Sequence, residues 1–407
     1  MTTVLPRREA IWVFLAFAAA YFFSALVRAV TATLAPTLTQ ELSLSAGDLG
    51  LLAGAFFLGF SALQAPMGLW LDRFGPRRVE VWFLTLAVIG CIIFSQADSF
   101  EGLLVARLLC GAGFAACLMA PLTGYRRWYS AATQLRANSW MLMTGSFGML
   151  ASTLPVQWLM PWIGWRGMFV GLALLILVAA ALILWRVPAW QAPSSVAEEH
   201  PSDEGYAAVW RHPYFRSLMP MGFFCYGGFL AVQTLWAGPW LVRVVGATPL
   251  ESALGLFLIN LCMLCTFWGW GVFNPYLLRR GWSANRLMLW GVPTSFFVLL
   301  ANILLGPAGG WWGWALYCMT CSFVTLAQPS IGLAFPPAFA GRALSAFNLV
   351  LFSGVFVVQW GIGILVDGFK SAQISEIMAF QLAMSVLLVC SVCSYLWFAH
   401  TIKECSA

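Results

Sequence analysis

The stretch "GLWLDRFGPRR", residues 68 to 78, places two glycines, a proline, an aspartate and three arginines between two strongly apolar segments. The surrounding chain has 407 residues, of which 61% are apolar and 9% are charged. About a quarter of the residues of an ordinary soluble protein are charged. The composition therefore predicts a membrane protein, in which this polar stretch is a loop between two membrane-spanning segments.

Apolar stretches of about 20 residues, the length that crosses a bilayer as a helix, recur along the whole chain. Alternating ten-residue strands of a barrel are not visible, so we predict an all-α membrane protein with twelve transmembrane helices in two halves of six. The predicted spans are residues 11 to 35, 48 to 70, 79 to 97, 102 to 123, 138 to 160, 167 to 186, 217 to 242, 251 to 273, 287 to 306, 311 to 333, 343 to 366 and 377 to 399.

The arginines fix the expected orientation, because basic residues beside spans stay on the cytoplasmic side. Most of the 21 Lys and Arg residues fall on one side if the N-terminus is cytoplasmic. We therefore expect a multi-pass protein of the cell inner membrane with both termini in the cytoplasm. The net charge of +6 reflects this bias and gives no reason to expect nucleic acid as a partner. The first span is too long for a signal peptide and lacks a small-residue cleavage site, so it is predicted to remain a helix.

The chain also divides into two similar parts. Residues 191 to 216, which include "PSSVAEEHPSDEGY", form the long polar stretch expected of a cytoplasmic linker between an N-terminal half, residues 1 to 190, and a C-terminal half, residues 217 to 407. "PLTG" at 121 to 124 and "PSIG" at 329 to 332 are each followed by an arginine, which indicates diverged copies. Duplicated halves around a central site are typical of transporters.

The loop between spans two and three resembles the signature loop of the major facilitator superfamily, G-x-x-x-D-R-x-G-x-R-R. The resemblance implies that the chain is a secondary transporter working by alternating access, and that the loop acts in gating by latching the cytoplasmic ends of the two halves. In the second half, "GVFNPYLLRRGW" keeps two arginines but has lost the acid. The predicted gating residues are Gly68, Asp72, Arg73, Gly75, Arg77 and Arg78.

"LVARLLCGAGFAA" in the fourth span resembles the second motif of that family, with Arg107, Gly111 and Gly113 in place and Cys110 where a glutamine is common. The resemblance covers the whole chain. It specifies the fold and transport as a class, and it does not specify a substrate.

Arg28 and Arg107 are the charged residues predicted within spans, where a charge costs roughly 2.5 to 3.5 kcal/mol even on the lenient insertion scale. Arg28 shares a helix face with Tyr21 and Thr31, and the two arginines lie at similar depths, about 12 and 9 Å from the outer ends of their helices. Two guanidinium groups in a cavity favour a carboxylate, phosphate or other oxyanion, so a small organic anion is the expected substrate. An arginine in the first span also resembles the anion-transporting branches of the superfamily. Two alternatives stay open: Arg107 braces helices through backbone carbonyls, and Arg28 extends towards the outer surface.

The remaining ionisable residues bear on whether the protein carries protons. All fifteen acids and three histidines are predicted in loops or at span ends, so no buried carboxyl is expected and a carboxylate-driven proton symporter is disfavoured. Exchange, facilitated diffusion and coupling through the arginines or peripheral acids remain open. Span five lacks the G-x-x-x-G-P-x-x-G-G pattern of drug/proton antiporters, although a drug or metabolite efflux carrier stays an alternative.

"YGGFLAVQTLWAGPW" in span seven contains Pro239, which removes a backbone donor and predicts a kink. Gln233 and Trp236 lie just before it, and both are candidate substrate contacts. In the alternative interpretation, Gln233 bonds a neighbouring helix and Trp236 packs.

Cysteine supplies a further alternative. Three C-x-x-C pairs lie in spans of the second half at Cys262, Cys318 and Cys390, and with nearby methionines they would suit a transporter of Cu(I). Free cysteine also serves as a small apolar packing residue. Catalytic constellations are absent from the sequence, so we expect no enzyme, no cofactor and no bound metal. The expected partners are a small-molecule substrate and the lipid bilayer, and the chain is expected to be a monomer.

Overall fold

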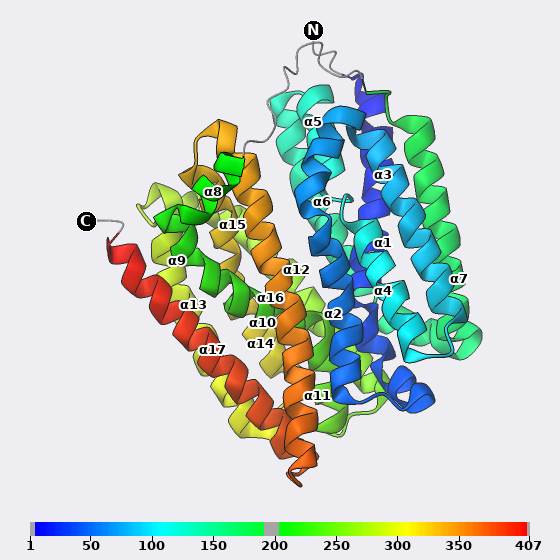
Figure 1. Ribbon diagram of the computed structural model, residues 1–407, viewed down its shortest axis with the longest axis vertical. Helices are drawn as coiled ribbons and strands as arrows, with labels where there is room; N and C mark the ends of the chain where they lie inside the picture. Colours follow the sequence, from blue (N-terminus) through cyan, green and yellow to red (C-terminus); the bar gives the residue numbers. More distant parts are fainter. Residues whose placement is uncertain (1–4, 191–202, 405–407) are drawn as a thin grey trace. The chain divides into compact units, whose positions relative to one another are not determined.

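The computed structural model describes residues 5–190 and 203–404, and the regular elements in these ranges are all helical (Figure 1). A helix satisfies its own backbone N–H and C=O groups where no water is available, which is why so apolar a chain adopts it. The predicted fold class is confirmed. The linker acids Glu198 and Glu199, together with His200, lie outside the described residues.

The helices before the linker are α1 Arg7–Leu42, α2 Ala46–Ala62, α3 Gln64–Gln96, α4 Phe100–Phe114, α5 Met119–Trp128, α6 Ala131–Ala151 and α7 Leu154–Arg186. The elements after it are α8 Asp203–Arg211, α9 Pro213–Met221, η1 Gly222–Tyr226, α10 Gly227–Ala231, η2 Val232–Trp236, α11 Ala237–Arg243, α12 Pro249–Arg279, α13 Ala284–Leu305, η3 Gly306–Ala308, α14 Trp311–Cys321, η4 Ser322–Leu326, α15 Ala327–Ala334, α16 Pro337–Ser371 and α17 Glu376–Glu404. Within the described residues, 10 helical segments are long and apolar enough to cross a membrane, and α2 is a shorter apolar helix.

The chain forms two compact units. Unit 1 comprises Met1–Thr31 and Ala55–Ala197, and unit 2 comprises Ala32–Gly54 and Glu198–Ala407. The end of α1 and the beginning of α2 thus group with the helices that follow the linker, whereas a division based on sequence alone places the first boundary in the linker.

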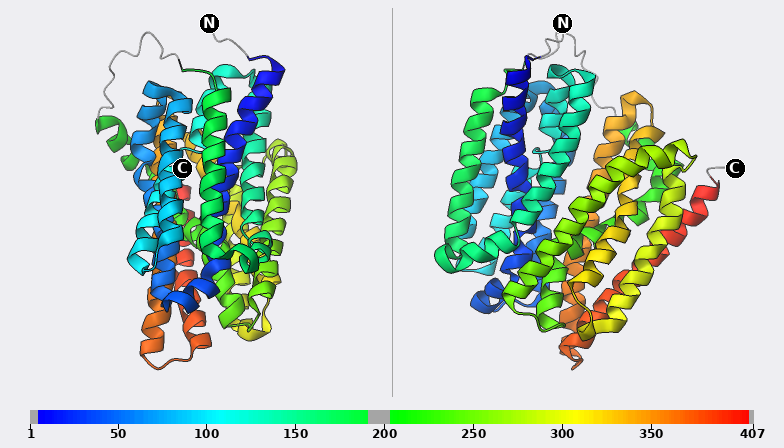
Figure 2. Two further views of the ribbon diagram at one scale, coloured as in Figure 1. Left: turned by 90° about the vertical axis from the view of Figure 1, so that its right-hand side faces the viewer. Right: turned by 180° about the vertical axis from the view of Figure 1, so that it is seen from behind.

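In unit 1, α3 packs along α4 and α7 (Figures 1 and 2). Gly111 and Gly113, from the motif "LVARLLCGAGFAA", allow two other helices to approach α4 closely. A Cβ added at Gly111 would collide with the backbone of Phe56 on α2, and one added at Gly113 would collide with the backbone of Ala87 on α3. Small residues at helix contacts are the usual means of close packing in membranes.

α3 holds parts of two predicted spans, because the helix continues across the polar loop with a sharp kink. Gly75 has φ 77° and ψ 162° inside it, and Pro76 follows. Such dihedrals are open to glycine and costly for other residues, so the glycine allows the chain to turn between two helical segments without an extended loop.

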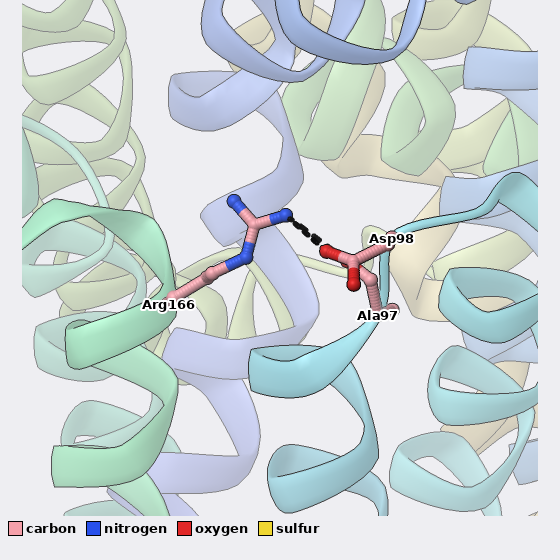
Figure 3. A network of polar contacts seen from close by, with 3 residues as sticks. All are labelled: Ala97, Asp98 and Arg166. Carbon is pink, nitrogen blue, oxygen red and sulfur yellow. Dashed lines mark hydrogen bonds and ion pairs between the residues drawn. The ribbon is translucent and has the colours of Figure 1, made fainter.

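α7 has a similar kink at Gly164, where φ is 64°. Just beyond it, Arg166 forms an ion pair with Asp98, with Nη2 and Oδ1 2.9 Å apart, and donates to the carbonyl oxygen of Ala97 at 3.2 Å (Figure 3). Asp98 lies in the connection between α3 and α4. The pair is largely exposed, so its contribution to stability is about 0–1 kcal/mol.

The helical segment Pro213–Arg243 in unit 2 contains two π-helical turns, η1 and η2. The second one ends at Trp236, just before Gly238 and Pro239. Pro239 has no N–H to donate to the carbonyl of Leu235, and its ring crowds the preceding turn. The distortion that Pro239 predicts is present as the π-helical turn η2, which contains Gln233 and Trp236.

Asp367 on α16 caps the beginning of α2 within unit 2. Its Oδ1 accepts from the N–H of Ala46 at 3.1 Å, and its Oδ2 accepts from the N–H of Gly47 at 2.6 Å. The next N–H, of Asp48, donates to the hydroxyl of Ser45 at 3.1 Å. A carboxylate from a distant helix thus satisfies the free donors at a helix N-terminus and interacts favourably with its dipole.

We expect Asp367→Ala to lower the stability of unit 2 by about 1–2 kcal/mol, through the loss of the cap and of the charge beside the helix N-terminus. The measurement is the thermal unfolding of purified protein in detergent. The melting temperature of Asp367→Asn is expected to fall between those of the wild type and Asp367→Ala. Asp98→Ala, which removes an exposed pair, is the control and should change little. Equal melting temperatures for Asp367→Ala and the wild type would contradict the capping role.

Candidate functional site

Arg28 on α1 lies in unit 1, and its side chain is half-buried. Its guanidinium carbon lies 5.7 Å from the ring centre of Phe60, and its Nε is buried without a hydrogen-bond partner among the described residues. The phenol of Tyr21, two turns earlier, interacts with the guanidinium. Ser24 lies between them, and its buried Oγ also has no partner in the described part of the chain. The polar face of α1 therefore combines one cation with two hydroxyl groups.

Arg107 on α4 is fully buried. Its Nη1 donates to the carbonyl oxygen of Val27 at 2.7 Å, and its Nη2 donates to that of Arg28 at 3.5 Å. Its guanidinium carbon lies 5.0 Å from the ring centre of Phe56. The two arginines thus meet at one level of unit 1, and Arg107 holds the backbone that carries Arg28. This geometry matches the interpretation in which Arg107 braces helices through carbonyls.

Glu80 on α3 is a buried acid that the sequence analysis did not identify. Its side chain has no exposed surface, and neither carboxyl oxygen has a hydrogen-bond partner among the described residues. The thiol of Cys117 is close enough to interact with the carboxyl without hydrogen-bond geometry, and the carboxyl also interacts with Tyr125.

The expectation that no carboxyl is buried is therefore wrong. Glu80 stands at the edge of the predicted third span, where an acid normally reaches water. In the structure the helix already begins again at Pro76, and both α4 and α5 pack against α3, so this position is enclosed. The signal in the sequence would have been a helix period that places residue 80 inward, together with the apolar residues Val79 and Val81 on either side of it.

Gln233 and Trp236 lie in unit 2 and are both buried. Nε2 of Gln233 donates to Oδ1 of Asn260 at 3.1 Å, and the indole of Trp236 donates to the carbonyl oxygen of Gln359 at 3.1 Å. Nε2 of Gln359 in turn donates to Oγ1 of Thr234 at 2.8 Å. These bonds match the interpretation in which Gln233 bonds a neighbouring helix and Trp236 packs.

The loop residues of the signature motif contact other parts of unit 1. The backbone oxygen of Asp72 accepts from the indole of Trp190 at 3.1 Å, and the Asp72 carboxylate interacts with Arg126. The guanidinium carbon of Arg127 lies 4.7 Å from the Trp190 ring centre. A Cβ at Gly75 would collide with the side chain of Trp190. In the same loop, Arg73 and Arg78 are exposed and Arg77 is partly exposed.

The cysteine pairs do not share one environment. Cys318 and Cys321 are buried, whereas Cys265 and Cys393 are exposed. Among the described residues, no three or more His, Cys, Asp or Glu side chains are grouped so that they could hold a metal ion. These observations give the Cu(I) alternative no support.

Several curated relatives of the chain are named as transporters of organic acids. The hexuronate transporter of Escherichia coli strain K12 is 28% identical over 179 residues, which is 44% of this chain and 39% of that protein. The probable sulfoacetate transporter SauU of Cupriavidus necator is 27% identical over 256 residues, which is 58% of this chain and 57% of that protein. The chain thus spans less than two thirds of the length of these curated relatives.

Solved structures share the fold over nearly the whole chain. A bacterial homologue of the human lysosomal transporter Spinster aligns with a TM-score of 0.79 at 17% identity, covering 98% of each chain. A D-xylose–proton symporter aligns with a TM-score of 0.76 at 14% identity, covering 95% of this chain and 97% of that one. The family model described as Major Facilitator Superfamily matches residues 17–359, a range that contains the signature loop and both span arginines. The chain therefore belongs to the Major Facilitator Superfamily.

Proposed function

We propose that the chain is a secondary transporter that carries a small organic anion across a bacterial inner membrane by alternating access. The observation that carries this proposal is the environment of Arg28: a partly accessible guanidinium within a membrane-spanning helix, with a free Nε and no ion pair to an acid among the described residues. A cation in such surroundings is stabilised by an anionic ligand.

The names of several relatives support an acid as the substrate. They include a hexuronate transporter, a probable sulfoacetate transporter and a probable L-galactonate transporter. Each of these substrates is a small organic molecule with one or more acid groups. In our proposal Arg28 binds the acid group in bidentate fashion, while Tyr21 and Ser24 supply hydrogen bonds to it or to a neighbouring hydroxyl.

The other predicted contacts take supporting roles in this proposal. Arg107 positions Arg28, because its own donors are used by backbone carbonyls. Gln233 and Trp236 have donors engaged within unit 2, so we assign them a packing role at the π-helical turn.

We further propose that the loop of residues 68 to 78 gates transport, that both termini are cytoplasmic and that the protein acts as a monomer. The exposed charges of Asp72, Arg73 and Arg78 support gating, since such groups can form contacts in one state and lose them in another. Gly68 offers a test, because a Cβ added there would meet no atom. Gly68→Ala should slow transport and leave ligand binding intact. Unchanged transport would remove this glycine from the gate.

A thermal-shift screen of the purified protein tests the anion site. A ligand at 100 times its dissociation constant stabilises the folded state by about 2.7 kcal/mol, so a bound acid raises the melting temperature. We expect sugar acids and short carboxylates or sulfonates to act, and neutral sugars and Cu(I) to leave the melting temperature unchanged. Arg28→Ala should lose the response, and Arg28→Lys should keep part of it, because lysine retains the charge without the planar fork.

The matched control is Arg166→Ala, which removes an exposed arginine of the same unit outside the proposed site. It should respond as the wild type does. A response to the acid that survives in Arg28→Ala would assign Arg28 a structural role and leave the proposed site without its central residue.

A further inference from the structure

Arg186, the last residue of α7, has surroundings that the proposed transport does not explain. Its guanidinium carbon lies 3.6 Å from the ring centre of Trp185 and 4.6 Å from that of Trp12 on α1. Its Nε is buried, and no described residue accepts a hydrogen bond from it. No acid within residues 5–190 and 203–404 forms an ion pair with it. The end of α7 thus carries a cation with two aromatic neighbours and no anion.

Arg166 of the same unit shows how such a group is completed by an anion. Its guanidinium carbon lies 4.0 Å from the ring centre of Trp165, and its Nη2 pairs with Oδ1 of Asp98 at 2.9 Å (Figure 3). A guanidinium stacks on aromatic rings through its flat faces, whereas its N–H donors point outward in its plane. The donors at the edge of Arg186 are therefore open to an anion from outside the described chain.

The position of Arg186 is the end of a membrane-spanning segment. Both α1 and α7 are long and apolar enough to cross a bilayer, and Trp12 lies in the second turn of α1. Arg8, one turn before Trp12 on the same helix face, is exposed, and so is Arg7. Glu9 is the acid of this first turn. Three arginines against one acid give this end of the two helices a net positive charge.

Apolar side chains continue from this charged end towards the middle of both helices. On α7, Leu182 and Val178 lie about one and two turns before Arg186 on the same face, and Val178 is 56% exposed. On α1, Leu15 follows Trp12 by about one turn and is 47% exposed. A phospholipid has the same division, with a charged headgroup at the interface and acyl chains below it. A free phosphate ion would make no use of the apolar part.

We propose that the ends of α1 and α7 bind the headgroup of an anionic phospholipid. The terminal N–H groups of Arg186 donate to the phosphate, Arg8 adds a second positive charge, and the indoles of Trp12 and Trp185 lie at the level of the headgroup. The site is separate from the proposed anion site, because Arg28 lies 16 positions after Trp12, about 24 Å along the helix. A bound lipid ties α1 to α7 and so stabilises unit 1.

The test uses the purified full chain in detergent, stripped of copurified lipid, with native mass spectrometry to measure lipid binding. The probes are dioleoyl phosphatidylglycerol, dioleoyl phosphatidylcholine and inorganic phosphate. The two lipids share their acyl chains and a phosphate, and they differ in the net charge of the headgroup. We expect phosphatidylglycerol to bind most tightly and to raise the melting temperature of the protein more than the other two probes do.

Arg186→Gln should weaken the binding of phosphatidylglycerol about fivefold, the factor that corresponds to the roughly 1 kcal/mol contributed by one arginine near an anionic membrane surface. Arg8→Gln should weaken it by a similar factor, and this variant alters an exposed side chain that folding does not require. The matched control is Arg166→Gln. It also removes an arginine beside an indole, but the donors of Arg166 already serve Asp98 and Ala97, so lipid binding should equal that of the wild type.

Several results would overturn the proposal. Equal affinity of the wild type for the two lipids would contradict a site for an anionic headgroup. Inorganic phosphate that binds as tightly as phosphatidylglycerol would assign the arginines to a free anion. A folded Arg186→Gln that binds phosphatidylglycerol as the wild type does would remove Arg186 from the site. If Arg186→Gln does not fold, Arg8→Gln decides: weaker binding supports the site, and unchanged binding contradicts it.

Discussion

Arg107→Ala should destabilise unit 1 and abolish most transport. The substitution removes a fully buried guanidinium and leaves the carbonyl oxygens of Val27 and Arg28 without their donor. Leaving buried polar groups unpaired costs about 1–3 kcal/mol each, and the vacated space adds to this loss. A displacement of about 1 Å in a residue that positions the substrate can lower a rate on the order of 100-fold.

The measurements for Arg107→Ala are thermal unfolding in detergent and anion uptake in proteoliposomes. Arg107→Lys should recover little, because a lysine ammonium cannot reproduce the fork that reaches two carbonyls. Arg166→Ala is the control, since it removes an exposed arginine whose ion pair contributes about 0–1 kcal/mol. Arg107→Ala that melts and transports as the wild type does would contradict the bracing role.

Gly75→Ala should also have a large effect, for two reasons that act together. At φ 77° and ψ 162° a residue with a Cβ is strained by about 1–3 kcal/mol. The new Cβ would also collide with Trp190, whose indole donates to the backbone oxygen of Asp72. We expect a lower melting temperature together with a change in tryptophan fluorescence.

Gly68→Ala is the matched control within the same motif, because a Cβ at Gly68 meets no atom and the residue has ordinary helical geometry. Its melting temperature should equal that of the wild type. If Gly75→Ala also melts at the temperature of the wild type, the loop can shift to accommodate the new Cβ. The contact with Trp190 then does not fix the backbone at residue 75. A loss of transport in Gly68→Ala without loss of stability would assign the motif a role in gating.

Much of the fold follows from the sequence, since the apolar stretches and the signature loop specify helices and a family. The depth of Arg28 and Arg107 also follows from the helical rise, and in the structure the Arg107 guanidinium meets the backbone at Arg28. The contacts of Arg107 could not be assigned in the same way, because a buried arginine serves a carbonyl or a substrate equally well on sequence grounds.

Glu80 shows where the sequence was insufficient. Burial of an acid at a helix end depends on which neighbouring helices cover it, and this is a property of tertiary packing. The grouping of residues 32–54 with unit 2 has the same origin, because the cap of α2 comes from Asp367, more than three hundred positions along the chain. The π-helical turn before Pro239 is an intermediate case: a proline predicts a distortion, and packing decides its form.

Uptake by proteoliposomes tests the central claim most directly. The protein is reconstituted as the wild type, Arg28→Gln and Arg28→Lys, and the entry of a labelled organic acid is compared with that of a neutral analogue of the same size. We predict that the wild type moves the acid and excludes the neutral analogue, that Arg28→Gln moves neither, and that Arg28→Lys retains a reduced rate for the acid. Equal uptake of the acid by the wild type and Arg28→Gln would contradict anion recognition by Arg28.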